Sequence, residues 1–220
     1  MDWIISQSER SLRPEKYEVH SKNGFTLRYV SSGNLRVLER ENEPFGVASG
    51  QLFGPLANPQ NLVSEDAETI GDMALKSEGS FSVAILQGKA VTLVTDAGGS
   101  IPIFYGQGPE GFAMGTLVHH VAALSGLDEV DKVSVADYLL NGTICYPYSW
   151  FDKVREVQSG SVVLFNGEEK LKHHTYWQPT EPEGVREDCD SEKWGGFLKE
   201  QVEGAVRLGI EGKSKGRVLY

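Results

Sequence analysis

The sequence predicts an α+β fold, and three patterns lead to that class. Short apolar segments separated by glycine-containing turns recur through the chain, as in antiparallel hairpins. Only short helical segments lie between these groups of strands. A longer amphipathic helix is predicted near the C-terminal end, after an acidic stretch that contains prolines.

The strands of the first third are predicted from alternation and turn residues. Apolar side chains flank the turn Lys22-Asn23-Gly24, which predicts a hairpin with an Asn-Gly turn. Residues 34–38 predict another strand. Residues 45–53 predict a further strand, rich in small residues and glycine where backbones approach closely, and ended by prolines.

The middle of the chain alternates helices with strand pairs. A helix is predicted to begin after Ser64 as its N-cap, with acidic residues in its first turn. Its apolar face consists of Ile70, Met73 and Ala74. The elements predicted after it are strands at 79–86, 90–95 and 112–116, a helix at 117–124 closed by Gly126, and a helix at 133–140 closed by Asn141-Gly142. A last hairpin joins strand 161–165 through Asn166-Gly167 to residues 170–177.

The domain organisation follows from composition. We expect one domain over residues 1–178, an acidic linker over residues 179–190, and the start of a second domain over residues 191–220. The second domain opens with an amphipathic helix whose apolar residues include Trp194 and Phe197. Arg217–Tyr220 begins what reads as a buried strand, so we expect the sequence to be a fragment of a longer protein.

Charge and composition exclude several classes of function. The formal net charge is −10 and the sequence pI about 5.0, so the chain would be repelled by a nucleic acid or an anionic membrane. The sequence has no signal peptide pattern and no apolar run of membrane-spanning length. Its two cysteines, Cys145 and Cys189, indicate neither a disulfide framework nor a zinc site, and we expect a cytoplasmic protein.

A series of motifs over Asp66–Trp177 resembles, in order and spacing, the N-terminal class II glutamine amidotransferase domain of asparagine synthase-type enzymes. The family pattern Arg-Asp-x-x-Gly-x-x-Pro-Leu-Tyr-Tyr corresponds to Thr95–Tyr105, and Phe-Ala-Ser-Glu corresponds to Phe112–Gly115. The other similar segments are Asp66–Glu68, Asp131–Gly142, Ser149–Gly160 and Tyr176-Trp177. The resemblance implies the four-layer αββα sandwich of N-terminal-nucleophile hydrolases, followed by the first helix of a truncated ATP-dependent synthetase domain.

The sequence departs from this family where the family performs its chemistry. The family's catalytic cysteine follows the initiator methionine, and its thiol acts with its own α-amino group as base. Asp2 occupies that position here, so we predict no catalytic residue in this chain. The family's Arg-Gly-Pro-Asp motif is not recognisable between Leu27 and Glu43, and its Asn-Gly-Glu-Ile-Tyr-Asn appears only as Ser49–Gly54.

Four residues are candidate remnants of the family's pocket: Gly50, Gln51, Asp66 and Glu68. For Asp66 and Glu68 an equally good interpretation is charge placed at a helix N-terminus. The Gly98-Gly99 loop could bind phosphate, but the family uses it as a turn beside the glutamine pocket. The pairs His119-His120 and His173-His174 do not predict a metal site, because adjacent residues on a helix or a strand point in different directions.

The resemblance implies a function for the parent protein. β-Lactam synthetases, carbapenam synthetases and lasso-peptide cyclases are relatives that activate a carboxylate with ATP and capture it with an internal amine. Such enzymes need no ammonia, so we expect a non-glutaminase domain that serves as a scaffold for its own C-terminal synthetase domain. ATP and Mg²⁺ would bind in the missing part, and this fragment would hold neither a cofactor nor a metal. The alternatives are a non-catalytic module that dimerises through the Trp194 face, and a functional glutamine-hydrolysing asparagine synthase.

Overall fold

The computed structural model describes residues 2–8, 10, 12, 17–30, 34–58, 66–167, 171–180 and 191–210. These residues fall into two compact units, Met1–Gln178 and Pro179–Tyr220, and each is described here by itself. Among the described residues, no helix combines the length and apolarity needed to cross a bilayer.

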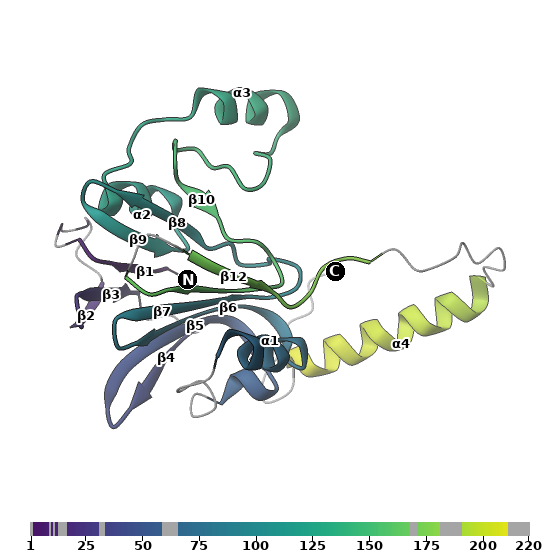
Figure 1. Cartoon of the computed structure of the whole chain (residues 1–220). Helices are drawn as coiled ribbons and strands as arrows, with labels where there is room; N and C mark the ends of the chain where they lie inside the picture. The colour runs from purple at the N-terminus through teal and green to yellow at the C-terminus, as the bar shows by residue number, and fades with distance from the viewer. Residues whose placement is uncertain are drawn as a thin grey trace. The chain divides into compact units, whose positions relative to one another are not determined.

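The first unit contains two antiparallel sheets of six strands each (Figure 1). The first sheet has the order β10-β8-β9-β1-β3-β2, formed by β1 (Trp3–Ser6), β2 (Glu18–Lys22), β3 (Phe25–Tyr29), β8 (Phe104–Gly108), β9 (Gly111–Gly115) and β10 (Arg155–Glu156). The second has the order β12-β11-β7-β6-β5-β4, formed by β4 (Leu35–Arg40), β5 (Glu43–Phe53), β6 (Glu78–Gln87), β7 (Ala90–Thr95), β11 (Ser161–Phe165) and β12 (Leu171–Thr175).

The main core lies between the two sheets, because each sheet turns one alternating set of side chains toward the other. The first sheet contributes residues such as Ile5 and Leu27, and the second contributes Val47 and Leu93, all buried. The rings of Phe112 and Phe165, from opposite sheets, stack with their centroids 3.7 Å apart.

A helix covers the outer face of each sheet. Helix α1 (Ala67–Leu75) buries Ile70 and Ala74 against the outer face of the second sheet, beside the short helix η1 (Pro55–Ala57). Helix α2 (Val118–Ser125) buries Val121 and Leu124 against the outer face of the first sheet. The order of layers is therefore α2, sheet, sheet, α1, which confirms the predicted αββα sandwich.

Most predicted elements are confirmed, including the Asn23-Gly24 hairpin turn, whose two residues have φ of 54° and 85°. The predicted N-cap of the first helix is wrong. The cap is Asp66, whose carboxylate accepts a hydrogen bond from the Thr69 backbone N–H, so the helix begins at Ala67. Ser64 lies outside the described residues, as do Arg217–Tyr220 and most of the predicted linker. The two-residue strand β10 was not predicted.

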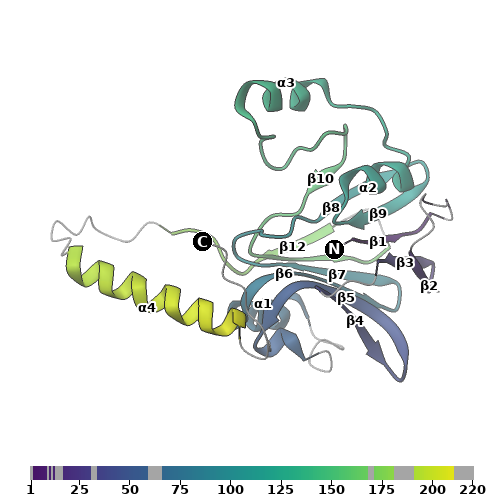
Figure 2. The same cartoon turned by 180° about the vertical axis from the view of Figure 1, so that it is seen from behind.

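Helix α3 (Lys132–Asn141) stands on an arm away from the two sheets, as the front and back views agree (Figures 1 and 2). Only Ser134 of this helix is buried. Asp131 caps its start, and the left-handed Gly142 ends it. The second unit consists, among its described residues, of Pro179, Thr180 and helix α4 (Ser191–Ile210), which carries the amphipathic pattern predicted from residue 191 onward.

Candidate functional site

Asp2, the residue in place of the expected nucleophile, lies directly before the central strand β1. Its backbone carbonyl accepts a hydrogen bond of 2.9 Å from the Val30 N–H, at the end of β3. On the other side, Trp3 is tied to Thr116 after β9 by a backbone hydrogen bond of 3.2 Å. Position 2 is therefore held at one end of the sandwich, at the middle of a sheet, where a reacting group would be well fixed.

The side chains around Asp2 form a titratable cluster. The Tyr17 hydroxyl lies 3.0 Å from His120 Nδ1, and the His119 ring packs edge-on against His120 at 4.2 Å. Burial lowers the pKa of His120, the neighbouring His119 lowers it further, and the negative charge of Asp2 opposes both effects. A neutral His120 can accept the hydrogen bond that the Tyr17 hydroxyl donates. The pKa of Tyr17 is raised by burial and then by Asp2, which keeps that hydroxyl protonated.

Trp3 occupies the space behind Asp2. Its side chain lies between the two sheets and is only 1% exposed, the bulkiest of the fully buried side chains in the described chain. Its indole Nε1 has no hydrogen-bond partner among the described residues. A tryptophan at this place fills the interior of the sandwich next to the expected nucleophile.

A row of hydroxyls crosses the second sheet at the same end. Ser49, Ser82 and Thr95 are directly paired across β5, β6 and β7. They point to the face of the sheet that Ala84 and Leu93 contribute to the main core, because side chains two positions apart share a face. Thr95 donates to the Gln158 carbonyl at 2.7 Å, whereas the Ser49 and Ser82 hydroxyls have no partner among the described residues.

The predicted pocket remnants lie on two separate elements. Gly50 has a φ of 90° in β5, and a Cβ there would lie 2.0 Å from the Ser80 carbonyl oxygen, so only glycine fits. Gln51 pairs with Ser80 on β6. Asp66 caps α1 and is exposed, and Glu68 is exposed in the first turn of that helix. Within the described ranges, no hydrogen bond or ion pair joins Gly50 and Gln51 to Asp66 and Glu68.

The Gly98-Gly99 loop is a turn organised by the buried carboxylate of Asp96. The carboxylate accepts hydrogen bonds from the backbone N–H groups of Phe81, Gly98 and Ser100, at 2.8–3.1 Å, and from the Ser100 hydroxyl. The Gly99 N–H is bonded to the Asp96 carbonyl. The N–H groups that a phosphate would need are already used, so the loop is a structural turn.

A small polar cavity of about 310 Å³ borders this turn and is lined in part by Asp96, Tyr176 and Trp177. The Tyr176 hydroxyl donates to the Thr95 carbonyl at 2.6 Å. Burial raises the pKa of Tyr176, and the charge of Asp96 raises it further. The protonated Tyr176, which follows β12 directly, therefore links the end of that strand to β7.

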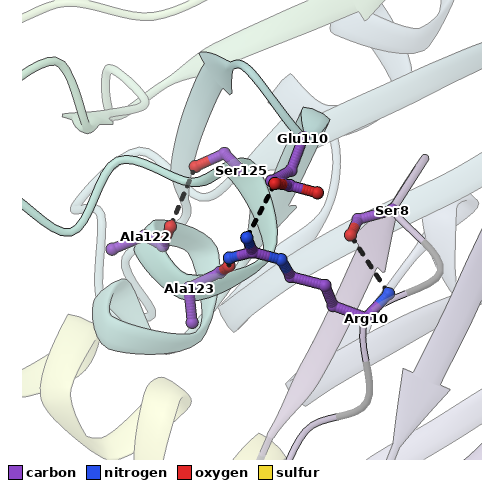
Figure 3. A network of polar contacts seen from close by, with 6 residues as sticks. All are labelled: Ser8, Arg10, Glu110, Ala122, Ala123 and Ser125. Atoms are coloured by element: carbon purple, nitrogen blue, oxygen red, sulfur yellow. Dashed lines mark hydrogen bonds and ion pairs between the residues drawn. The ribbon is translucent and has the colours of Figure 1, made fainter.

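Arg10, which follows β1, reaches the turn between β8 and β9 and the end of α2 (Figure 3). The Arg10 guanidinium forms an ion pair with Glu110 at 2.7 Å and donates to the Ala123 carbonyl near the end of α2, where a cation is favourable. The buried Arg28 donates to the Ser6 hydroxyl and to the carbonyls of Ser8 and Arg10. These contacts hold Ser8 and Arg10, which follow β1, against the neighbouring elements of the first sheet and α2.

The two predicted histidine pairs are placed as follows. His173 lies near Tyr105 with ring centroids 6.5 Å apart, whereas His174 lies over Gly71 of α1, so the pair points to opposite faces as predicted. The His119 and His120 rings contact each other, contrary to the expectation that adjacent helical residues diverge.

The fold is an αββα sandwich, the architecture that the resemblance to amidotransferases implies. Comparison with protein families agrees on the class. A model of the glutamine amidotransferase domain matches residues 62–177, more than half of the chain. The protein therefore belongs to the glutamine amidotransferase domain family.

Solved structures give a more distant likeness. One is a glutamine phosphoribosylpyrophosphate amidotransferase from B. subtilis complexed with ADP and GMP, with 14% identity, a TM-score of 0.38, and coverage of 71% of this chain and 36% of that chain. Another is an allosteric regulatory enzyme of purine biosynthesis, with 11% identity, a TM-score of 0.44, and coverage of 81% and 43%. The chain spans less than half of the length of either structure. Comparison with curated proteins finds no match.

Sequence reasoning did not single out Trp3, the Tyr17–His120 contact or the role of Asp96. The signal for Trp3 was a large apolar residue immediately after the expected nucleophile. The signal for Asp96 was an aspartate two residues before a glycine pair, the spacing of an Asx turn. The Tyr17–His120 contact joins residues 103 positions apart and left no local signal.

Proposed function

We propose that this chain is the N-terminal, non-glutaminase domain of an ATP-dependent amide-forming ligase related to asparagine synthase. The observation that carries the proposal is the pairing of Asp2 with the buried Trp3 at the start of the central strand. One residue removes the nucleophile, and the next fills the space behind it.

The chemistry of glutamine hydrolysis needs groups that Asp2 and its neighbours do not supply. A thiol attacks the amide with a nearby base, and hydrogen-bond donors must stabilise the oxyanion that develops. The Asp2 carboxylate is a poor nucleophile toward an amide, and its charge would repel an oxyanion. Ser49 stands where the resemblance places the oxyanion asparagine, and its short, buried side chain offers one hydroxyl in place of an amide.

The ligase activity belongs to the rest of the parent protein. In this proposal, residues 191–220 begin the synthetase domain, and ATP and Mg²⁺ bind to parts of that domain beyond this sequence. The parent would activate a carboxylate as an acyl-adenylate and capture it with an amine of the substrate, in the cytoplasm. The amidotransferase-type unit then acts as a scaffold for its own synthetase domain.

The apolar face of α4 supports this arrangement. Trp194, Phe197 and Leu198 are 48–63% exposed, and Val202 and Val206 continue the same stripe. An exposed apolar face of this kind on a helix is typical of a surface that packs against another element. In this proposal, the rest of the synthetase domain covers the apolar stripe of α4.

The same face favours one alternative function, a non-catalytic module that dimerises through α4. Size-exclusion chromatography of the chain and of its Trp194→Glu variant separates the two ideas. A dimer that becomes a monomer on substitution would support the module, and a monomer in both cases would exclude it.

The proposal is tested by introducing the family's cysteine nucleophile at position 2. In an Asp2→Cys variant whose initiator methionine has been removed, the thiol and α-amine are present, but Trp3 and Ser49 remain. We expect no glutamate release from glutamine above that of an Asp2→Ser control. Glutamate release by the cysteine variant alone would mean that the rest of the glutaminase site is intact, which contradicts the part that the proposal assigns to Trp3 and Ser49, and glutamate release by the unchanged chain would contradict the proposal as a whole.

A further inference from the structure

The end of the sandwich opposite Asp2 holds a cavity of about 530 Å³. The hairpin turns between β2 and β3, β4 and β5, and β6 and β7 surround it, through residues that include Asn23, Glu41 and Gly88. The register places it far from the candidate site, because Trp3 pairs with Tyr29 at one end of β3 and Lys22 pairs with Phe25 at the other. A cavity of this size is typical of sites for small molecules.

The cavity combines apolar side chains with charges of both signs. Phe45 and Leu86, both partly buried, provide the apolar surface. Four charged side chains line it as well: Lys22, Arg40, Glu41 and Glu43. Lys22 and Glu43 form an ion pair with each other, which lowers the pKa of Glu43 and joins the two sheets. Arg40 and Glu41 have no ion-pair partner in the part of the chain that the structure describes.

The turn that carries Glu41 is strained in a way that the neighbouring turns are not. Glu41 and Asn42 both have left-handed backbones, with φ of 54° and 65°. A two-residue hairpin turn of this kind favours Asn followed by Gly, the pair found at Asn23-Gly24. A glutamate in this conformation costs stability without forming an ion pair. Strain kept at the rim of a cavity points to a role for the side chain in that cavity.

We propose that this cavity binds a free α-amino acid with an apolar side chain. The planar guanidinium of Arg40 would hold the carboxylate through paired hydrogen bonds, and Glu41 would accept hydrogen bonds from the ammonium group. Phe45 and Leu86 would cover the side chain. A ligand with only one charge would leave either Arg40 or Glu41 unmatched. The site does not depend on the proposed function, since it lies at the other end of the sandwich.

The test is calorimetric titration of the full chain with L-leucine, with leucinamide and N-acetyl-L-leucine as controls that each lack one charge. We expect saturable binding of leucine, and binding at least about tenfold weaker for each control, because each loses a charge-assisted pair of hydrogen bonds. The absence of saturable leucine binding would overturn the proposal. Equal binding of all three compounds would overturn the two-charge recognition on which it rests.

Variants locate the site. Arg40→Gln and Glu41→Gln should each weaken leucine binding about tenfold, while Arg36→Gln, an exposed position on the same strand outside the cavity, should leave it unchanged. An equal effect at Arg36 would contradict the placement.

The turn gives a second readout that a merely structural role would not produce. Replacing Glu41→Asn together with Asn42→Gly should raise Tm by about 2–4 °C through relief of strain, yet weaken leucine binding. A more stable variant that binds leucine as well as the original chain would contradict a binding role for Glu41.

Discussion

The two ends of the sandwich differ in what fills them. At the end that carries Asp2, the interior is occupied by Trp3 and by a row of hydroxyls from the second sheet. At the opposite end, three hairpin turns surround an open cavity with charged walls. The interior beside Asp2 is thus filled with side chains, whereas the opposite end leaves space between its turns, although the same two sheets form both ends.

The largest expected effect tests whether Trp3 fills the first end. Trp3→Ala should reduce the free energy of unfolding by about 3–5 kcal/mol, because it removes a fully buried side chain and leaves a cavity between the sheets. Chemical denaturation followed by circular dichroism measures this. The matched control is Trp194→Ala on α4, where the side chain is half exposed and the cost should be small. Equal costs at the two positions would show that Trp3 does not support the core.

A smaller effect is expected at the Asp96 turn, which closes the same end. Asp96→Asn replaces one accepting oxygen by an NH₂ group, so a buried backbone N–H loses its partner, at a cost of about 2–3 kcal/mol. Denaturation of this variant beside Asp152→Asn, on the arm, gives the comparison. A loss no larger than that of the control would contradict the role of Asp96 as the organiser of the turn.

Two buried hydroxyls of the second sheet, Ser49 in the row and Ser161 in β11 outside it, should change stability in opposite directions when they are removed. Ser49→Ala removes a buried hydroxyl without a described partner and should stabilise the fold by about 1 kcal/mol. Ser161→Ala removes a buried hydroxyl that donates to the Gln158 carbonyl, and should destabilise it by about 1 kcal/mol. Thermal unfolding of the two variants distinguishes them, and destabilisation by both would mean that Ser49 has a partner.

The smallest expected effect is the contribution of His120 to the pH dependence of the unfolding free energy. Burial lowers its pKa in the folded chain below the unfolded value of about 6.5, so the unfolded chain binds the proton more readily. Stability is therefore complete above pH 6.5 and falls as the pH drops through the interval between the two values. His120→Phe should flatten this part of the curve of unfolding free energy against pH.

His173 and Tyr17 both affect how the pH dependence of the unfolding free energy is interpreted. Burial also lowers the pKa of His173, so the flattening should be partial. Tyr17→Phe removes the hydrogen bond but leaves the imidazole to titrate, so this variant should keep a pH-dependent loss. A His120→Phe curve as steep as that of the original chain would contradict the assignment.

The sequence predicted the elements well wherever a local signal existed. The Asn23-Gly24 turn, the glycine closures of α2 and α3, and the alternating strands all come from short-range rules and are confirmed. The pairing of β11 with β12 is confirmed as well, whereas part of the connection after Asn166-Gly167 lies outside the described residues. Ser64 was chosen as a cap by its residue type, but Asp66 has the spacing that reaches the Thr69 N–H. The αββα layers came from the resemblance, since alternation alone does not say which sheets stack.

The site was less predictable, because its contacts join distant parts of the chain. The resemblance predicted a role for position 2 and for the segment 49–54, and both stay predictions. Whether Trp3 points into the core depends on the register of β1 between β3 and β9, which no local pattern fixes. The grouping of the turns at 22–25, 40–43 and 87–90 around one cavity likewise depends on the stacking of the two sheets.

The most direct test of the central claim is glutamine hydrolysis by the purified 220-residue chain, with its intact mass recorded in the same preparation. We predict no release of glutamate or ammonia above the buffer background when the mass shows Met1 and Asp2 present. Release above background, in proportion to the amount of protein, would contradict the assignment of a non-glutaminase domain.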